Sequence, residues 1–361
     1  MKVSPFALAC AVACSCGLML QSAASAESPR TLDRALAGFD YDYEAQVEPA
    51  SPSDLTPPLV VANNSVCGCD TGDGDCDAAC GPTWTFRVGS VIMKRSNPTA
   101  FPVFSDFGSG ATLVDAANYR FHTRGGLDIG AIRNIRDDLA FDFRYFAIDS
   151  WTASQTSALA PASLLNNSLP LGFFGFSSAT STYGSNLYST EFNLRRNHGW
   201  LQTYLGYRYV ELNEDLNFLL SPPVVYRESA DNRLHGLQLG ANANVWNNGN
   251  RLRLDSWIKA GVYYDLIRHG SAIEFPPGSP LLPPTNQRDN NTAFLGEIGL
   301  VGIYQLTDTI AIRGGYQLLW LDGVALASEQ VQTTNILTGT GSDVHGDVFF
   351  HGALVGVEAQ W

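Results

Sequence analysis

Alternating hydropathy is the feature of this sequence that most narrows its possible folds. In segment 236–246 every second residue from Leu237 to Val245 is apolar, and the residues between them are glycine, glutamine or asparagine. A side-chain period of two is the geometry of a β-strand with one apolar face. The Asn-Asn-Gly-Asn sequence at 247–250 tolerates positive φ and predicts a tight turn. Segment 252–264 repeats the alternation, so the two segments predict an antiparallel hairpin.

The same alternation recurs from residue 84 to the C-terminus and predicts about ten strands, each near the roughly 9–11 residues that cross a bilayer. Short turns are expected near 134–137, 197–199, 247–250 and 306–309, and long loops near 96–119, 152–185, 213–232, 266–290 and 322–346. This order favours an all-β fold, an antiparallel up-and-down transmembrane β-barrel of about ten strands, with roughly 8–12 possible. A soluble β-sandwich shares the alternation but has shorter strands, typically about 5–6 residues.

The N-terminal region predicts an exported protein. Lys2, an apolar stretch over 6–20 and small residues at 24–26 are typical of a signal peptide, expected over 1–26. Residues 27–82 are rich in proline and acidic residues and lack a sustained period, so they predict a flexible acidic leader in the periplasm. The barrel is then expected over 83–361 in the outer membrane. Its expected partners are the lipid bilayer and the barrel assembly machinery.

Charge excludes one class of partner. The chain carries a net charge of -13 and no basic stripe, which argues against nucleic-acid binding. No motif for a cofactor stands out, and none is expected. The oligomeric state is left open by the sequence.

Four cysteines lie in the leader, at Cys67, Cys69, Cys76 and Cys80. An even number in an oxidising compartment favours two disulfides, with three possible pairings. The spacings C-x-C and C-x3-C differ from the paired C-x2-C of zinc knuckles. Asp73, Asp75 and Asp77 have the spacing of calcium-loop ligands. However, Ala78 stands where such a loop needs glycine, and its twelfth position is not glutamate, so calcium is a weak alternative.

The functional candidates are charged residues on the polar face of the predicted strands, which should line the lumen. They are Arg87, Asp128, Asp142, Arg144, Glu191, Arg195, Arg208, Arg253, Asp255, Lys259, Glu297, Arg313 and Glu358. One interpretation is a narrow, porin-like channel whose charges select ions or small solutes. The alternative is a structural or surface-display barrel whose charges pair across the interior and plug it, since roughly eight strands already enclose a lumen that side chains can fill.

An enzyme is the least favoured class. Some outer membrane barrels are hydrolases with Asp and His at the outer rim, and this chain has histidines near predicted loops at His122, His235, His269 and His345. Asp231, Asp265, Asp343 and Asp347 lie nearby in sequence. Proximity in sequence is not geometry, however, and neither a nucleophile motif nor a clear metal pair is present. No enzymatic activity is expected.

Aromatic residues at predicted strand ends should form girdles at the two boundaries between lipid and water. They include Tyr145, Trp151, Trp200, Tyr207, Tyr209, Tyr264, Tyr304, Trp320 and Trp361. The chain ends on the last of these, after alternating apolar positions at 353–359. Trp361 is therefore expected to act as the signal for membrane insertion, on a last strand that closes against the first near residues 84–92.

Three stretches resemble a large family of planctomycete outer membrane β-barrel proteins and, more distantly, a Legionella family of pore-forming outer membrane proteins. They are Gly206-Tyr-Arg-Tyr-Val-Glu-Leu-Asn-Glu-Asp-Leu216, the segment 316–330 that begins Tyr-Gln-Leu-Leu-Trp, and His351-Gly-Ala-Leu-Val-Gly-Val-Glu-Ala-Gln-Trp361. The resemblance covers about residues 84–361. It implies a barrel, a location in the outer membrane and a pore as the activity, and it supplies no catalytic residues.

Overall fold

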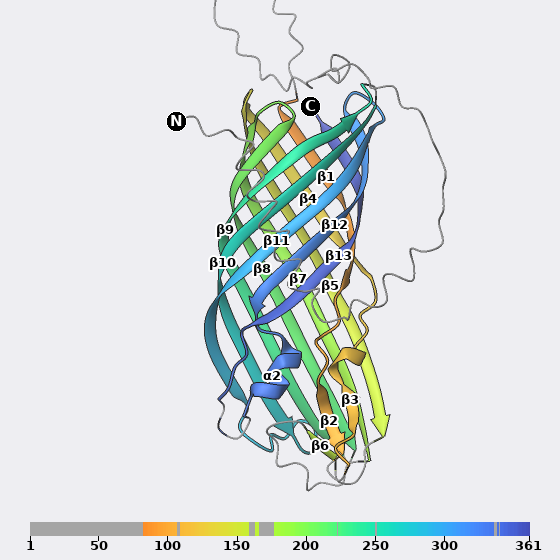
Figure 1. Cartoon of the computed structure of the whole chain (residues 1–361), viewed down its shortest axis with the longest axis vertical. Helices are drawn as coiled ribbons and strands as arrows, with labels where there is room; N and C mark the ends of the chain where they lie inside the picture. Colours follow the sequence, from red (N-terminus) through yellow and green to blue (C-terminus); the bar gives the residue numbers. More distant parts are fainter. Residues whose placement is uncertain are drawn as a thin grey trace, which may run out of the picture. The chain divides into compact units, whose positions relative to one another are not determined.

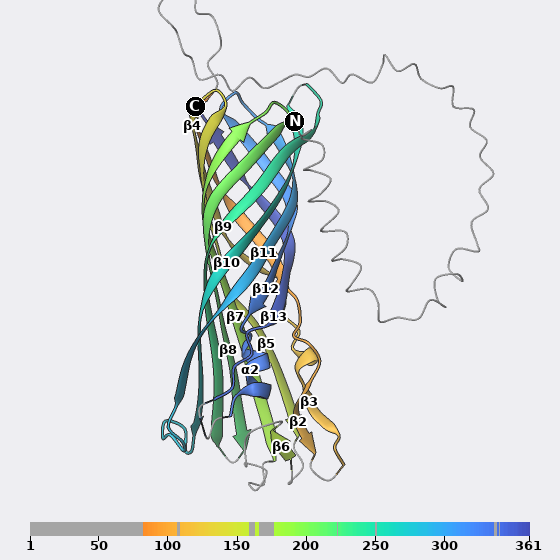
Figure 2. The ribbon, with the colours of Figure 1, turned by 60° about the vertical axis from the view of Figure 1, so that its left-hand side comes forward.

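The computed structural model describes residues 82–106, 109–158, 163–165, 177–221, 223–249, 251–335, 338 and 340–361. The predicted signal peptide and nearly all of the predicted leader lie outside this range. Within it, antiparallel strands close into a ten-stranded barrel, which confirms the predicted fold (Figures 1 and 2). In chain order they are β1 (Trp84–Arg95), β4 (Arg124–Arg136), β5 (Leu139–Ala158), β7 (Ser178–Asn197), β8 (Leu201–Ser221), β9 (Val224–Asn247), β10 (Leu252–Glu274), β11 (Thr285–Gln305), β12 (Ile310–Val324) and β13 (Gly346–Gln360).

The last strand closes the barrel against the first, as the sequence predicts. Strand β13 pairs with β1 from Gln360 opposite Thr85 to Phe350 opposite Arg95. The backbones of Trp84 and Trp361 exchange two hydrogen bonds of 3.0 and 3.1 Å at the end of this seam. A closed barrel satisfies its backbone groups between strands and leaves no edge open to pairing with another chain.

The outer wall of the barrel carries an apolar belt. Along β9 the outward-facing Leu237 and Leu239 are 67% and 65% exposed, whereas Gln238 between them is 1% exposed. The belt continues on neighbouring strands through Leu205, Val262 and Ile298, all of them exposed. So much contiguous apolar surface is unfavourable in water and favourable in a bilayer.

Beyond the belt the strands continue, but the two faces of the barrel wall exchange character. Apolar residues now face inward and polar residues face outward. In β8 the inward Arg208 and the outward Tyr207 give way to the inward Leu212 and Leu216. The alternate positions, which face outward, are the polar residues Glu211, Asn213, Asp215 and Asn217. The long-strand extension, as we call this region, comprises residues 150–158, 178–187, 210–221, 224–234, 265–274 and 285–292 of β5 and β7 to β11. There the wall is polar outside and apolar inside, like a soluble protein.

The loops at this end of the barrel are mostly shorter than the sequence predicts, because the strands are longer. Strands β5 and β7 to β11 are 20–24 residues long, roughly twice the expected length. Strand β8 ends at Ser221 and β9 begins at Val224, so the predicted loop 213–232 is almost entirely strand. The prediction was wrong because it assigned loops to polar residues, and here polar residues occupy the outer face of strands.

Two chain segments fill the inner face of the extension where β1, β4, β12 and β13 stop short (Figures 1 and 2). One, the connection between β1 and β4, contains β2 (Pro102–Asp106), β3 (Thr112–Asp115) and the short helix η1 (Ala116–Asn118). Its small sheet is completed by β6 (Ser163–Leu165) from the connection between β5 and β7. The other contains the helix α2 (Ala327–Thr333). Phe104 packs edge-on against Phe218 of β8, and Tyr119 against Tyr183 of β7. The core of the described barrel is concentrated here.

One predicted girdle residue lies inside the barrel. Trp151 is fully buried, packs on Phe350 and donates a hydrogen bond of 3.1 Å from Nε1 to the carbonyl of Met93. A bulge in β5 between Ile148 and Trp151, with Ser150 at a φ of 65°, turns the indole inward. Other predicted girdle residues, such as Trp200 and Tyr264, are exposed. Among the described helices, none combines the length and the apolar character that a membrane-spanning helix needs.

Candidate functional site

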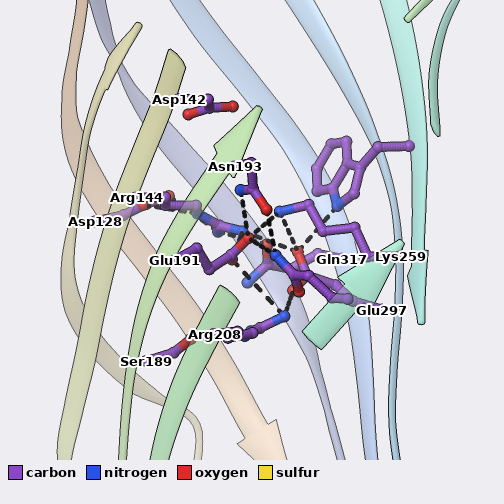
Figure 3. A network of polar contacts seen from close by, with 12 residues as sticks. Asp128, Asp142, Arg144, Ser189, Glu191, Asn193, Arg208, Lys259, Glu297 and Gln317 are labelled. Atoms are coloured by element: carbon purple, nitrogen blue, oxygen red, sulfur yellow. Dashed lines mark hydrogen bonds and ion pairs between the residues drawn. The ribbon is translucent and has the colours of Figure 1, made fainter. Parts of the chain in front are cut away.

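A layer of largely buried charged residues crosses the barrel next to the extension, on its short-turn side (Figure 3). We call it the central charge layer, and its members are Asp128 on β4, Arg144 on β5, Glu191 on β7, Arg208 on β8, Lys259 on β10 and Glu297 on β11. Glu297 accepts hydrogen bonds from Arg144 at 2.8 Å and from Arg208 at 2.7 Å. Strands β5, β8 and β11 are not neighbours in the sheet, so these contacts span the lumen.

The central charge layer balances its own charge. Its three carboxylates face three basic side chains, and Lys259 contacts Glu191 at 2.6 Å while Arg144 contacts Asp128 at 3.1 Å. Amide and indole groups satisfy further positions: Gln238 donates to Glu191 at 2.9 Å and Trp257 to Glu297 at 3.0 Å. Buried charges are tolerated when they are paired and hydrogen-bonded in this way. The layer therefore closes the lumen with a compact polar network.

On the short-turn side of this layer the lumen holds a small cavity of about 60 Å³ that opens to solvent. Its wall is strongly charged, with Arg87, Arg195 and Arg313 among the lining residues. Arg87 donates to Glu358 across the β1–β13 seam at 3.1 Å. Arg253 contacts the same carboxylate at 3.2 Å. A small polar solute could occupy this cavity.

All thirteen predicted lumen residues lie on described strands, and most of them meet one another. Arg195 pairs with Asp142, and Arg253 contacts both Asp255 and Glu358. The remaining pairs are those of the central charge layer and of Arg87. Arg313 is the exception, since it forms no ion pair or hydrogen bond with the part of the chain that the structure describes. The pairing pattern could not be read from the sequence because it depends on which strands face each other across the barrel.

A second polar group, inside the extension, was missed by sequence reasoning. Glu214 of β8 contacts Arg95 and the hydroxyl of Tyr183, and all three side chains are buried. It also accepts a hydrogen bond of 3.2 Å from the backbone N–H of Ala327, the first residue of α2. Asn232 of β9 similarly receives the backbone N–H of Ala325 at 2.7 Å. These contacts fasten the β12–β13 connection to the inner wall. They were overlooked because their strand segments had been expected to be loops.

The carboxyl of Glu329, on α2, lies in an acidic setting. Burial raises its pKa to about 8, and Asp343 and Glu214 add to the effect. Its Oε2 atom has no hydrogen-bond partner among the described residues. Glu329 is therefore protonated in the folded protein over much of the neutral range.

Two of the candidate hydrolase histidines, His235 and His269, lie on opposite faces of the barrel wall. His235 faces outward and pairs with the hydroxyl of Tyr207 at 2.8 Å, on the outer wall. His269 is buried, 4.0 Å from Glu228. No group of three or more potential metal ligands occurs in the described portion of the chain. The predicted disulfide residues Cys67, Cys69, Cys76 and Cys80, and the calcium candidates Asp73, Asp75 and Asp77, lie outside the described residues.

No protein-family model and no curated protein matches the chain. Among solved outer membrane barrels, the translocator domain of the autotransporter NalP from Neisseria meningitidis is 11% identical, with 79% of this chain and 90% of that one covered and a TM-score of 0.39. Neisserial surface protein A is 10% identical over 77% and 97% of the two chains, with a TM-score of 0.29. The toluene transporter TodX from Pseudomonas putida is 9% identical over 77% and 89%, also with a TM-score of 0.29. Likenesses this distant carry no argument about function, which must come from the residues of this barrel.

Proposed function

We propose that this protein resides in an outer membrane and that its barrel is a narrow, porin-like channel for ions or small solutes, closed at the central charge layer in the conformation described. The apolar belt supports the membrane location, because it would be costly in water. The charged cavity beside the closed layer supports the channel. It gives a water-compatible path through the short-turn half, which faces the periplasm in this orientation.

The contrast between the two halves of the barrel carries the proposal. The extension is filled mainly with apolar side chains such as Leu216 and Phe218, and it buries fewer charges, among them the pair of Arg95 and Glu214. The chain can therefore fill a barrel interior largely without charge. In the belt region it instead retains a charged interior. Apolar residues can replace buried ion pairs with little or no loss of stability, so a purely structural filling does not require charge. A lumen that admits ions does require polar groups along its wall.

A structural or surface-display barrel is the second candidate, and one observation favours it. The two segments packed inside the extension obstruct the lumen at the long-strand end, and Glu214 and Asn232 hold one of them in place. Conduction would require that this filling move. A barrel that never conducts would instead serve to anchor the leader or to present its long-strand end.

Conductance of the purified full-length protein in a planar bilayer separates the two candidates. The channel predicts discrete steps, and replacement of Arg144 or Arg313 by glutamate should shift the reversal potential toward cations in a salt gradient. Arg196→Glu is the matched control, because the Arg196 side chain is 65% exposed outside the lumen. A folded, heat-modifiable barrel without steps would favour the structural role. Conduction with unchanged selectivity in both lumen variants would reject these residues as its lining.

The surroundings of the barrel complete the proposal. Residues 27–82 form a periplasmic leader, and Trp361 serves the assembly machinery as the insertion signal. Membership in the planctomycete family stays a prediction, since no family model matches the chain.

A further inference from the structure

The charges that line the belt-region lumen do not cancel. The seven bases are Arg87, Arg144, Arg195, Arg208, Arg253, Lys259 and Arg313, and the six acids are Asp128, Asp142, Glu191, Asp255, Glu297 and Glu358. One positive charge is in excess. The next inward acid along β10 is Asp265, which lies six residues beyond Lys259, on the other side of the central charge layer. At about 3.3 Å per residue it is roughly 20 Å away along the strand and does not neutralise the cavity.

The excess resides on Arg313. Its position on β12 is opposite Ile303 of β11 and Gly356 of β13, neither of which offers a side-chain acceptor. The nearest acid along β13 is Glu358, which is already shared by Arg87 at 3.1 Å and Arg253 at 3.2 Å. The Nε atom of Arg313 is buried and has no hydrogen-bond partner among the residues the structure describes. This N–H has lost water without gaining an acceptor, which is unfavourable, and the side chain that carries it lines the cavity.

We propose that Arg313 binds a small monovalent anion, such as a halide, nitrate or a short carboxylate, in the cavity on the short-turn side of the central charge layer. One such anion would cancel the single excess charge. The cavity has the room, and Arg87 and Arg195 also line it, so further N–H donors are at hand. The flat guanidinium fork suits oxyanions and carboxylates as well as halides. This inference names the solute class of the channel and in that respect rests on the proposed function.

Chloride is the probe for the test. The folded full-length protein, in a nonionic detergent with gluconate as the other anion, should broaden the ³⁵Cl resonance in a saturable way that nitrate competes away. Arg313→Gln should weaken this binding at least about tenfold, because a charged hydrogen-bond donor is removed. Arg313→Lys should retain much of it, and the exposed control Arg196→Gln should retain all of it. Absence of saturable broadening in the wild type, or equal broadening in Arg313→Gln, would overturn the assignment.

Asp142→Asn keeps the proposal testable if the Arg313 variants do not fold. Asp142 lines the same cavity and pairs with Arg195, so its neutralisation frees a second guanidinium and should tighten chloride binding. Unchanged or weaker binding in a folded Asp142→Asn barrel would overturn the proposal. Bilayer recordings separate it from the function proposed above. Chloride binding without any conductance rejects the channel and leaves the site, whereas a cation-selective conductance with no chloride binding rejects the site alone.

Discussion

Replacement of Glu297 by glutamine tests whether the central charge layer holds the barrel together. Glu297 is 3% exposed and is the shared acceptor of Arg144 and Arg208. Without its charge, two acids remain for three bases. Arg208, which is fully buried, keeps only Glu191 at 3.7 Å as an ionic partner. Breaking a buried pair by removing one member typically costs about 3–5 kcal/mol. Because glutamine keeps the shape and one acceptor, we expect the lower end, about 3 kcal/mol.

The assay is urea unfolding of the barrel in lipid vesicles, followed by circular dichroism and by the mobility shift of unheated samples. Glu211→Gln is the matched control, since Glu211 is partly exposed and its ion pair with Arg233 is long, at 3.9 Å. It should lose less than about 1 kcal/mol. The double variant Arg208→Gln/Glu297→Gln restores neutrality and should be about 2 kcal/mol more stable than the sum of the single effects predicts. A Glu297→Gln barrel as stable as the control variant would refute the account of the layer.

Three further predictions concern the chain end, α2 and the leader. Deletion of Trp361 removes its stacking on Phe86 and the seam hydrogen bonds to Trp84, so it should lower membrane insertion in cells before it lowers the stability of barrels already folded; normal insertion would contradict the signal. The pKa of Glu329 rises from 4.5 to about 8 on folding. Between pH 4.5 and about 8 the folded protein therefore keeps a proton on Glu329 that the unfolded chain has lost. Stability should therefore fall as pH rises from about 5 to 8, with a slope that Glu329→Gln flattens in melting experiments; an unchanged slope would argue against the buried setting. Thiol titration without reductant should find no free cysteine in the mature protein, and four reactive thiols would reject the two disulfides.

The fold of the belt region was predictable because lipid and lumen impose opposite demands on alternate residues. Segment 236–246 satisfied both demands, and its outward leucines and inward amides lie where the alternation placed them. The extension was not predictable in the same way. There Leu212 faces inward and Asn213 outward, which is the pattern of a strand in a soluble protein. Because this pattern is the reverse of that in the belt, the segment was predicted to be a loop. A change of phase at constant period, rather than a loss of period, was the signal available in the sequence.

The candidate site was predictable as a set of residues but not as a network. Alternation alone identified Glu191 and Glu297 as members of the polar face. That both carboxylates share Arg208 follows from the closure of ten strands, which brings β7, β8 and β11 together across the lumen. The unpaired state of Arg313 likewise depends on the glycine opposite it and on the two partners that already occupy Glu358. Neither is a property of local sequence.

Alternate side chains of the belt region face lipid and a closed lumen. Two native tryptophans can report which side chains face lipid. Trp320 packs on Phe294 on the outer wall, whereas Trp257 lies inside the barrel and donates a hydrogen bond to Glu297. Two full-length variants are made, each of which keeps one of these two tryptophans and has phenylalanine at the other six tryptophan positions. The quenching of tryptophan fluorescence is then measured in vesicles of brominated lipid. The account predicts strong quenching of Trp320 and almost none of Trp257. Equal quenching of both, or stronger quenching of Trp257, would contradict it.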